Sequence, residues 1–288
     1  MVIIMILTTD LIGKIAEKKE KCTYFSSDYV ILYKSMEVED DLLEEYLERM
    51  KKAHESGIHI PKVLEYQLLT EFNEKKSMGI FVEERAKGNV LNVRGIVLKE
   101  SQQYDFSQVI TTYLNKVEQY LEELKRRSLA SQETYDKFLD DFMRLHEFGL
   151  RPDPNSLNYL FDSTYGFTII DPYFMECNQM VEKDLFRFIM NDVYGVSRPS
   201  ILIKRDQIEG FYYLTPDLKH DLDQCSELIN DKICCAFLKK GFHFDYILSE
   251  MEKNKNRYRT EEQAFSKEEL VSKLQKQFER KMDGGKVK

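Results

Sequence analysis

The sequence predicts an α+β protein in which a small antiparallel sheet with one helix precedes a larger, mainly helical region. Three observations lead to this fold class. The first third of the 288 residues alternates short β-like runs with one helical pattern, and the segment 106–148 carries two amphipathic stripes. Gly (12) and Pro (6) are scarce while 42% of the residues are hydrophobic, which excludes linker-dominated and low-complexity architectures.

The N-terminal third is expected to follow the order β-β-β-α-β-β. Runs of β-branched, aromatic and aliphatic residues separated by polar connections predict strands over 11–15, 22–25, 29–33, 61–66 and 78–83. Good helix formers run from about Val38 to Glu55, and Gly57 follows as a stop signal. The apolar residues at helical spacing are Leu42, Leu43, Tyr46, Leu47 and Met50.

The remainder is expected to be helical apart from one hairpin. Two helices fill 106–148 and end at Gly149, and a hairpin follows with strands over 159–161 and 167–170 and a turn over 162–166. Ser266 and Glu269 have the spacing of a capping box, which predicts a last helix. We therefore expect an N-terminal β-rich lobe over 1–88, a helical lobe over 89–265 and a peripheral helix with a tail over 266–288.

Charge and cysteine content exclude several function classes. The formal net charge of −8 argues against nucleic acid as the main partner, because binding to nucleic acid depends on neutralising phosphates. The apolar run over 1–7 is too short to span a membrane. Five cysteines without a CxxC pair favour neither a disulfide framework nor a zinc site, so we expect a reduced, cytoplasmic protein.

Three polar residues around the predicted hairpin carry the candidate chemistry. Asn158 and Asp171 are equally far from a turn centre between Thr164 and Tyr165, so the hairpin is predicted to bring them together. Amide and carboxylate oxygens suit Mg²⁺ bound to substrate phosphates. Asp153 precedes Asn158 by five residues, so it could reach the same cavity and act there as a base. Such a spacing alone is usually structural, and the order of the surrounding elements gives it weight.

In the order of these elements and polar residues along the chain, the sequence resembles the protein kinase-like superfamily. This superfamily includes protein kinases and the aminoglycoside and choline phosphotransferases. The resemblance covers about residues 11–175. Asp153 and Asn158 match the catalytic-loop spacing, and Asp171 matches the metal-binding aspartate 13 residues later. The segment 29–34, ending in Lys34, resembles the strand with the phosphate-binding lysine, 58–64 resembles the entry to the fourth strand, and 79–88 resembles the fifth strand and the hinge.

The resemblance implies a two-lobed kinase-like fold and an ATP-dependent phosphotransferase that uses Mg²⁺ and an unidentified hydroxyl acceptor, either a small molecule or a protein. Lys34 would hold the α and β phosphates, oriented by Glu48, with Glu44 or Glu45 as alternatives. The remaining implied roles are adenine contact by the backbone around Glu84 to Ala86, metal binding by Asn158 and Asp171, and acceptor orientation by Asp153.

Departures from the family pattern leave a second interpretation open. The stretch that should form a glycine-rich loop, 13–21, has only Gly13, and the catalytic loop begins Arg151-Pro152. The metal-binding motif reads Asp171-Pro172-Tyr173, and no Ala-Pro-Glu follows. These features argue against a conventional regulated protein kinase and leave a pseudokinase that binds nucleotide or protein without catalysis as the alternative.

Overall fold

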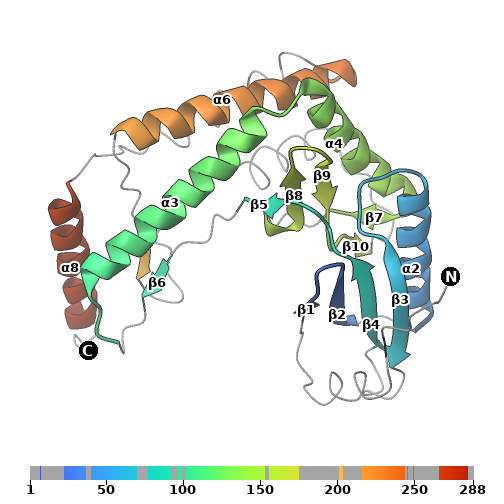
Figure 1. The fold of residues 1–288 in the computed structure, drawn as a ribbon, viewed down its shortest axis with the longest axis horizontal. Coiled ribbons are helices and arrows are strands. Elements are labelled where there is room, and N and C mark those ends of the chain that lie inside the picture. Colours follow the sequence, from blue (N-terminus) through green and yellow to red (C-terminus); the bar gives the residue numbers. More distant parts are fainter. Residues whose placement is uncertain are drawn as a thin grey trace. The chain divides into compact units, whose positions relative to one another are not determined.

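A computed structural model describes the chain over residues 7, 23–36, 40–69, 77–91, 96–98, 102–152, 156–174, 201–203, 216–243, 245, 249 and 266–284 (Figure 1). The protein is α+β, with small, mostly antiparallel sheets and long helices, which confirms the predicted class. No helix in these ranges has both the length and the apolar character needed to cross a membrane.

The N-terminal sheet has four antiparallel strands in the order β1-β2-β4-β3. The strands are β1 (Thr23–Phe25), β2 (Tyr29–Met36), β3 (Val63–Leu69) and β4 (Ser77–Glu84). Their positions confirm four of the five predicted strands, and the fifth, over 11–15, lies outside the described residues. The β-branched and aromatic content of these runs explains their extended conformation, and Ile80, Phe81 and Val82 of β4 are buried.

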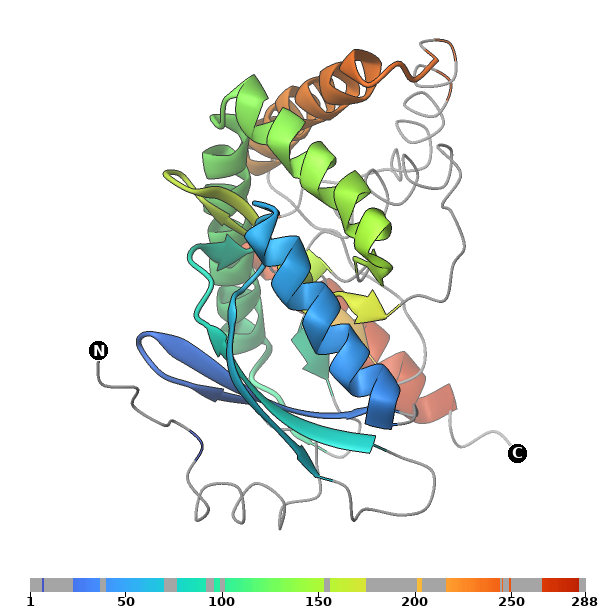
Figure 2. The same ribbon diagram turned by 90° about the vertical axis from the view of Figure 1, so that its right-hand side faces the viewer.

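Helix α2 (Asp40–Glu55) lies along one face of this sheet (Figures 1 and 2). Its buried side chains recur every three or four residues and form one stripe along one face of the helix, namely Leu43, Tyr46, Leu47, Met50 and Ala53. Gly57, with φ +85°, follows its last turn as predicted.

The chain divides into two compact units. One contains Met1–Gly88, Lys137–Asp153 and Asn158–Gln179, and the other contains Asn89–Asp136, Pro154–Leu157 and Met180–Lys288. The division after residue 88 coincides with the expected end of the N-terminal lobe. The structure differs from the expected helical lobe over 89–265, because residues 137–153 and 158–179 belong to the N-terminal unit.

Aromatic packing joins these later segments to one another, and hydrogen bonds from α4 join them to the end of α2. The second half of α4 (Gln132–Leu145) is followed by η1 (His146–Phe148), β7 (Leu150–Arg151), η2 (Ser156–Asn158), β8 (Tyr159–Asp162), β9 (Gly166–Ile169) and β10 (Tyr173–Phe174). The ring of Phe138 on α4 lies 4.6 Å from that of Phe167 and 5.9 Å from that of Tyr159. Side chains of α4 also donate to carbonyls beyond the end of α2, Lys137 to Gly57 at 2.8 Å and Arg144 to Ser56 at 3.0 Å.

The second unit is built around three helices: α3 (Phe106–Ser128), α6 (Pro216–Lys239) and α8 (Lys267–Gly284). Both α6 and α8 contact α3. Its strands are β5 (Asn89–Val90) and the parallel pair β6 (Ile96–Leu98) and β11 (Ile201–Ile203). The predicted capping box is confirmed, because Ser266 N–H donates to Glu269 at 2.8 Å and Glu269 N–H donates to Ser266 at 3.2 Å.

Candidate functional site

The N-terminal unit carries every described residue that the sequence analysis selected for the site. Lys34 is on β2, Glu48 is on α2, and Glu84 and Ala86 are at the end of β4 and in the loop that follows. Asn158 ends η2, and Asp171 follows β9. Asp153 lies outside the described residues. Lys34, Glu48, Glu84, Ala86, Asn158 and Asp171 therefore all belong to one compact unit.

The sheet register fixes the position of residue 34. Lys34 pairs with Gly79 of β4, and directly paired residues of an antiparallel sheet lie on the same face. A Cβ atom built on Gly79 would lie 3.1 Å from Cδ2 of Leu43 on α2. Position 34 is therefore on the face of the sheet that α2 covers.

The predicted partner of Lys34 is not found on that face. The Glu48 side chain is 59% exposed, and its carboxylate lies 3.9 Å from Nζ of Lys51. Glu44 is exposed, and Glu45 binds Arg49 of the next turn. The choice of these glutamates as partners of Lys34 is therefore not supported. The buried stripe of α2 faces the sheet and leaves residues 44, 45 and 48 on the solvent side of the helix.

The backbone at the end of β4 presents a hydrogen-bond donor. Glu84 N–H donates to the Lys62 carbonyl at 2.8 Å, and Arg85 N–H donates to the Asp28 carbonyl at 2.9 Å. Within the described ranges, the N–H of Ala86 donates to no other residue. Of the three residues expected to meet adenine, Ala86 is thus the one whose donor is available to a ligand.

The loop after β4 is held against the β8–β9 hairpin. Gly88 has φ +102°, and a Cβ atom there would lie 2.4 Å from the backbone C and O atoms of Phe161. Lys87 Nζ lies 3.9 Å from the ring centre of Tyr165 in the hairpin turn, and the hydrogen bond with Tyr165 raises the pKa of Lys87. Only glycine satisfies both the dihedral angle and the close approach.

Gly88→Ala is expected to lower the free energy of unfolding by about 2–3 kcal/mol, because it adds a backbone collision to an unfavourable φ. Gly57→Ala is the matched control, since Gly57 also has a positive φ but has no atom within 4 Å of the added Cβ. That variant should lose about 1 kcal/mol. Urea denaturation of both variants measures the difference, and equal losses would contradict the close approach.

The hairpin has the predicted strands but a different register. Tyr159 pairs with Ile169, and Ile170 N–H donates to the Asn158 carbonyl at 2.8 Å, so Asn158 is opposite Ile170. The predicted pairing of Asn158 with Asp171 is therefore wrong by one residue. The cause is the turn, in which Asp162 Oδ1 accepts from Thr164 N–H at 2.8 Å and from Tyr165 N–H at 3.1 Å. This Asx turn centres the hairpin on Thr164.

Asp171 has an uncommon backbone conformation. Its φ of +52° is the only positive value among the described residues other than glycine. Aspartate tolerates this region better than most residues, and such conformations concentrate at functional sites because the surroundings must impose them.

Asn158 and Asp171 carry the types of oxygen ligand that Mg²⁺ bound to phosphates prefers. They offer one amide and one carboxylate oxygen, both hard ligands. In the described ranges no group of three or more His, Cys, Asp or Glu side chains could hold a metal ion by itself. Mg²⁺ often has one or two carboxylates and completes its shell with substrate phosphates and water, so a two-residue set is sufficient.

Tyr46, His146 and Glu83 were not predicted as site residues, and all three belong to the N-terminal unit and are buried or partly buried. Tyr46 was expected only as part of an apolar stripe, and its hydroxyl contacts the segment after Asp171. Burial and the nearby Arg151 lower the pKa of His146, so its imidazole is neutral at pH 7. Glu83 is buried on β4. In the sequence, Glu83 directly follows the apolar run from Ile80 to Val82, and an acid next to such a run is the signal that could have drawn attention to it.

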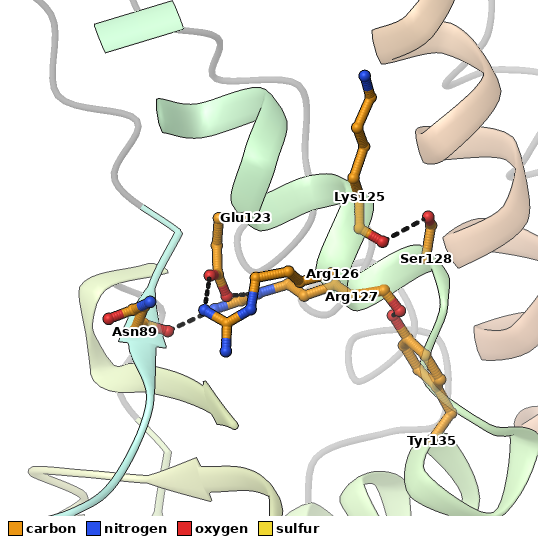
Figure 3. A network of polar contacts seen from close by, with 7 residues as sticks. All are labelled: Asn89, Glu123, Lys125, Arg126, Arg127, Ser128 and Tyr135. Carbon is orange, nitrogen blue, oxygen red and sulfur yellow. Dashed lines mark hydrogen bonds and ion pairs between the residues drawn. The ribbon is translucent and has the colours of Figure 1, made fainter. Parts of the chain in front are cut away.

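The second unit contains a separate polar network and a cavity. Fully buried Arg127 donates to Glu123 at 2.9 Å and to the Asn89 carbonyl at 3.1 Å, and Arg126 donates to the other oxygen of Glu123 at 3.1 Å (Figure 3). A cavity of about 340 Å³ lies beside this network and is lined by Asn89, Val90, Lys116, Gln119, Tyr120, Glu122, Glu123 and Arg126.

Comparison of the chain with models of known protein families and with characterised proteins found no match.

Proposed function

We propose that the protein is an ATP-dependent phosphotransferase with a divergent protein kinase-like fold, which transfers the γ-phosphoryl group to a hydroxyl acceptor. The observation that carries the proposal is the arrangement of the N-terminal unit. An antiparallel sheet covered by one helix, a loop with an available donor at Ala86, and a hairpin flanked by Asn158 and Asp171 belong to one compact unit. The order of these elements along the chain agrees with the resemblance in sequence.

Each residue has a proposed role. Lys34 binds the α and β phosphates, and the N–H of Ala86 with a neighbouring carbonyl of residues 84–86 binds the edge of adenine. Asn158 and Asp171 hold Mg²⁺, which when bound neutralises charge on the phosphate oxygens. Asp153 orients the acceptor hydroxyl. The protein would catalyse transfer by positioning and by charge neutralisation, since phosphoryl transfer needs little covalent chemistry from it.

One observation favours the alternative of a pseudokinase that binds nucleotide or protein without transfer. None of the three glutamates considered as partners of Lys34 lies on the buried face of α2. In an active enzyme of this type the lysine is held by such an acid. The alternative predicts binding without transfer, so binding and transfer must be measured separately.

Ala86→Pro is expected to weaken ATP binding by about tenfold, because it removes the only backbone donor among residues 84–86 that is available to a ligand. The measurement is the change in melting temperature with ATP and Mg²⁺. Ala86→Ser is the matched control because it keeps the N–H, and it should shift like wild type.

A ligand-side measurement keeps this test decisive if proline alters the loop. An ATP analogue with two methyl groups on the exocyclic amine cannot donate to a carbonyl of the loop, so it should produce a smaller shift than ATP on the unmodified protein. Equal shifts for proline and serine variants, together with equal shifts for ATP and the analogue, would contradict adenine binding at this loop.

Transfer itself is tested with radiolabelled ATP. The wild type is incubated first alone, to detect autophosphorylation, and then with pooled small-molecule acceptors that carry hydroxyl groups. Label that appears with wild type and is lost in Asp153→Ala supports the phosphotransferase. A shift with ATP and Mg²⁺ but no labelled product would support the pseudokinase, and the absence of any shift at millimolar ATP would contradict both.

A further inference from the structure

Helix α2 reaches the segment after Asp171 through a buried tyrosine. The Tyr46 hydroxyl donates to the Pro172 carbonyl at 2.9 Å, and both residues are buried. The two residues are 126 positions apart in the chain. A buried tyrosine hydroxyl normally finds a partner, and here the partner belongs to the residue directly after the candidate metal ligand.

The backbone chemistry of Pro172 gives this contact its effect. The pyrrolidine ring fixes φ of Pro172, and a hydrogen bond to its carbonyl restricts its ψ. The peptide that follows Asp171 then has little remaining freedom. Asp171 itself holds φ +52°, a conformation that persists only where neighbouring structure imposes it. The Tyr46–Pro172 hydrogen bond is a contact between this segment and α2.

One helical turn further on, Arg49 binds the segment that leads to Asp153. Arg49 Nη1 donates to the Gly149 carbonyl at 3.1 Å, and Glu45 orients the guanidinium by accepting from Nε at 3.1 Å and from Nη2 at 2.5 Å. Gly149 has φ +64°, and a Cβ atom there would lie 1.9 Å from Arg49 Nη1. Residue 149 must therefore be glycine for Arg49 to lie where it does.

We propose that Tyr46 is a positioning residue for Asp171 and that α2 acts on the site through Tyr46 and Arg49, not through a glutamate beside Lys34. The inference rests on the proposed function for its link to magnesium and ATP. Its structural part, that Tyr46 fixes the backbone of the Asp171 segment, rests on contacts within one compact unit.

The test compares Tyr46→Phe with Tyr135→Phe. Each change removes one hydroxyl from a buried ring. Tyr135 is the matched control because its hydroxyl also donates to a backbone carbonyl, that of Arg127 at 3.1 Å, but lies in the other unit. Amide hydrogen exchange should become faster at residues 171, 173 and 174 in Tyr46→Phe and stay unchanged there in Tyr135→Phe. The Mg²⁺ concentration that gives half of the ATP-dependent thermal shift should rise about tenfold in Tyr46→Phe alone, as is typical when a residue that orients a metal ligand is lost.

The outcomes separate this inference from the proposed function. Unchanged exchange at residues 171, 173 and 174 in Tyr46→Phe would overturn the inference. Faster exchange with an unaltered Mg²⁺ requirement would also overturn it, because the segment would then move without consequence for the metal. If the wild type shows no Mg²⁺-dependent shift with ATP, the proposed function fails, and hydrogen exchange alone decides whether Tyr46 fixes the segment.

Discussion

Asp171→Asn is expected to lower the rate of phosphoryl transfer by at least about 100-fold and to abolish the Mg²⁺-dependent part of the thermal shift with ATP. The change keeps the size of the side chain but removes the negative charge and one hard oxygen from a two-residue donor set. Losing one preorganised electrostatic group at a site where charge develops typically costs 100-fold to 1000-fold in rate. The measurements are labelled product per unit time and melting temperature as a function of Mg²⁺.

Asp231→Asn is the control for the loss of one carboxylate. Asp231 is exposed on α6 in the other unit, so the change alters net charge equally without touching the candidate site. This variant should behave like wild type in both measurements. If Asp171→Asn keeps both the rate and the Mg²⁺-dependent shift, Asp171 is not a metal ligand and the proposed function loses its main support.

The sequence was sufficient for those elements whose signals are local. The strands β1 to β4, the helix α2 and its stop at Gly57 follow from period, composition and turn chemistry within short windows. The capping box at Ser266 and Glu269 is equally local, since three residues separate its members. In each case the deciding interactions lie within a few residues, so neighbouring side chains carry enough information.

Local sequence signals were not sufficient to predict the hairpin register or the partner of Lys34. A difference of one residue in the register depends on Asp162 capping the turn, which competes with other two- and three-residue turns of similar composition. The choice of Glu48 came from family spacing, whereas the phase of α2 is set by the fit of Leu43 and Leu47 beneath the sheet. That fit depends on residues distant in sequence.

Tyr46 illustrates the limit of sequence reasoning at the site. Its spacing from Leu43 and Met50 identifies it correctly as a buried position. The sequence has no signal for the partner of its hydroxyl, because Pro172 is 126 residues away in the chain. For the same reason the sequence carries no local signal that residues 137–153 and 158–179 belong to the same compact unit as the N-terminal sheet.

Glu123→Ala is expected to lower the free energy of unfolding by about 3–5 kcal/mol, the usual cost of leaving one member of a buried ion pair without its partner. Arg127 is fully buried, and Glu123 accepts from Arg127 Nε at 2.9 Å (Figure 3). Without this carboxylate the guanidinium would remain desolvated, with the Asn89 carbonyl as its other acceptor shown in the network. Urea denaturation followed by far-ultraviolet circular dichroism measures the loss.

Glu122→Ala is the matched control because residue 122 is adjacent on α3 but exposed, so its loss should be within about 0.5 kcal/mol of zero. A second variant tests the mechanism. Replacing Glu123 by leucine and Arg127 by methionine together removes both buried charges and keeps apolar volume, so it should recover most of the lost stability. If the double variant is as unstable as Glu123→Ala, an unpaired buried charge is not the cause of the loss, because the double variant carries neither charge.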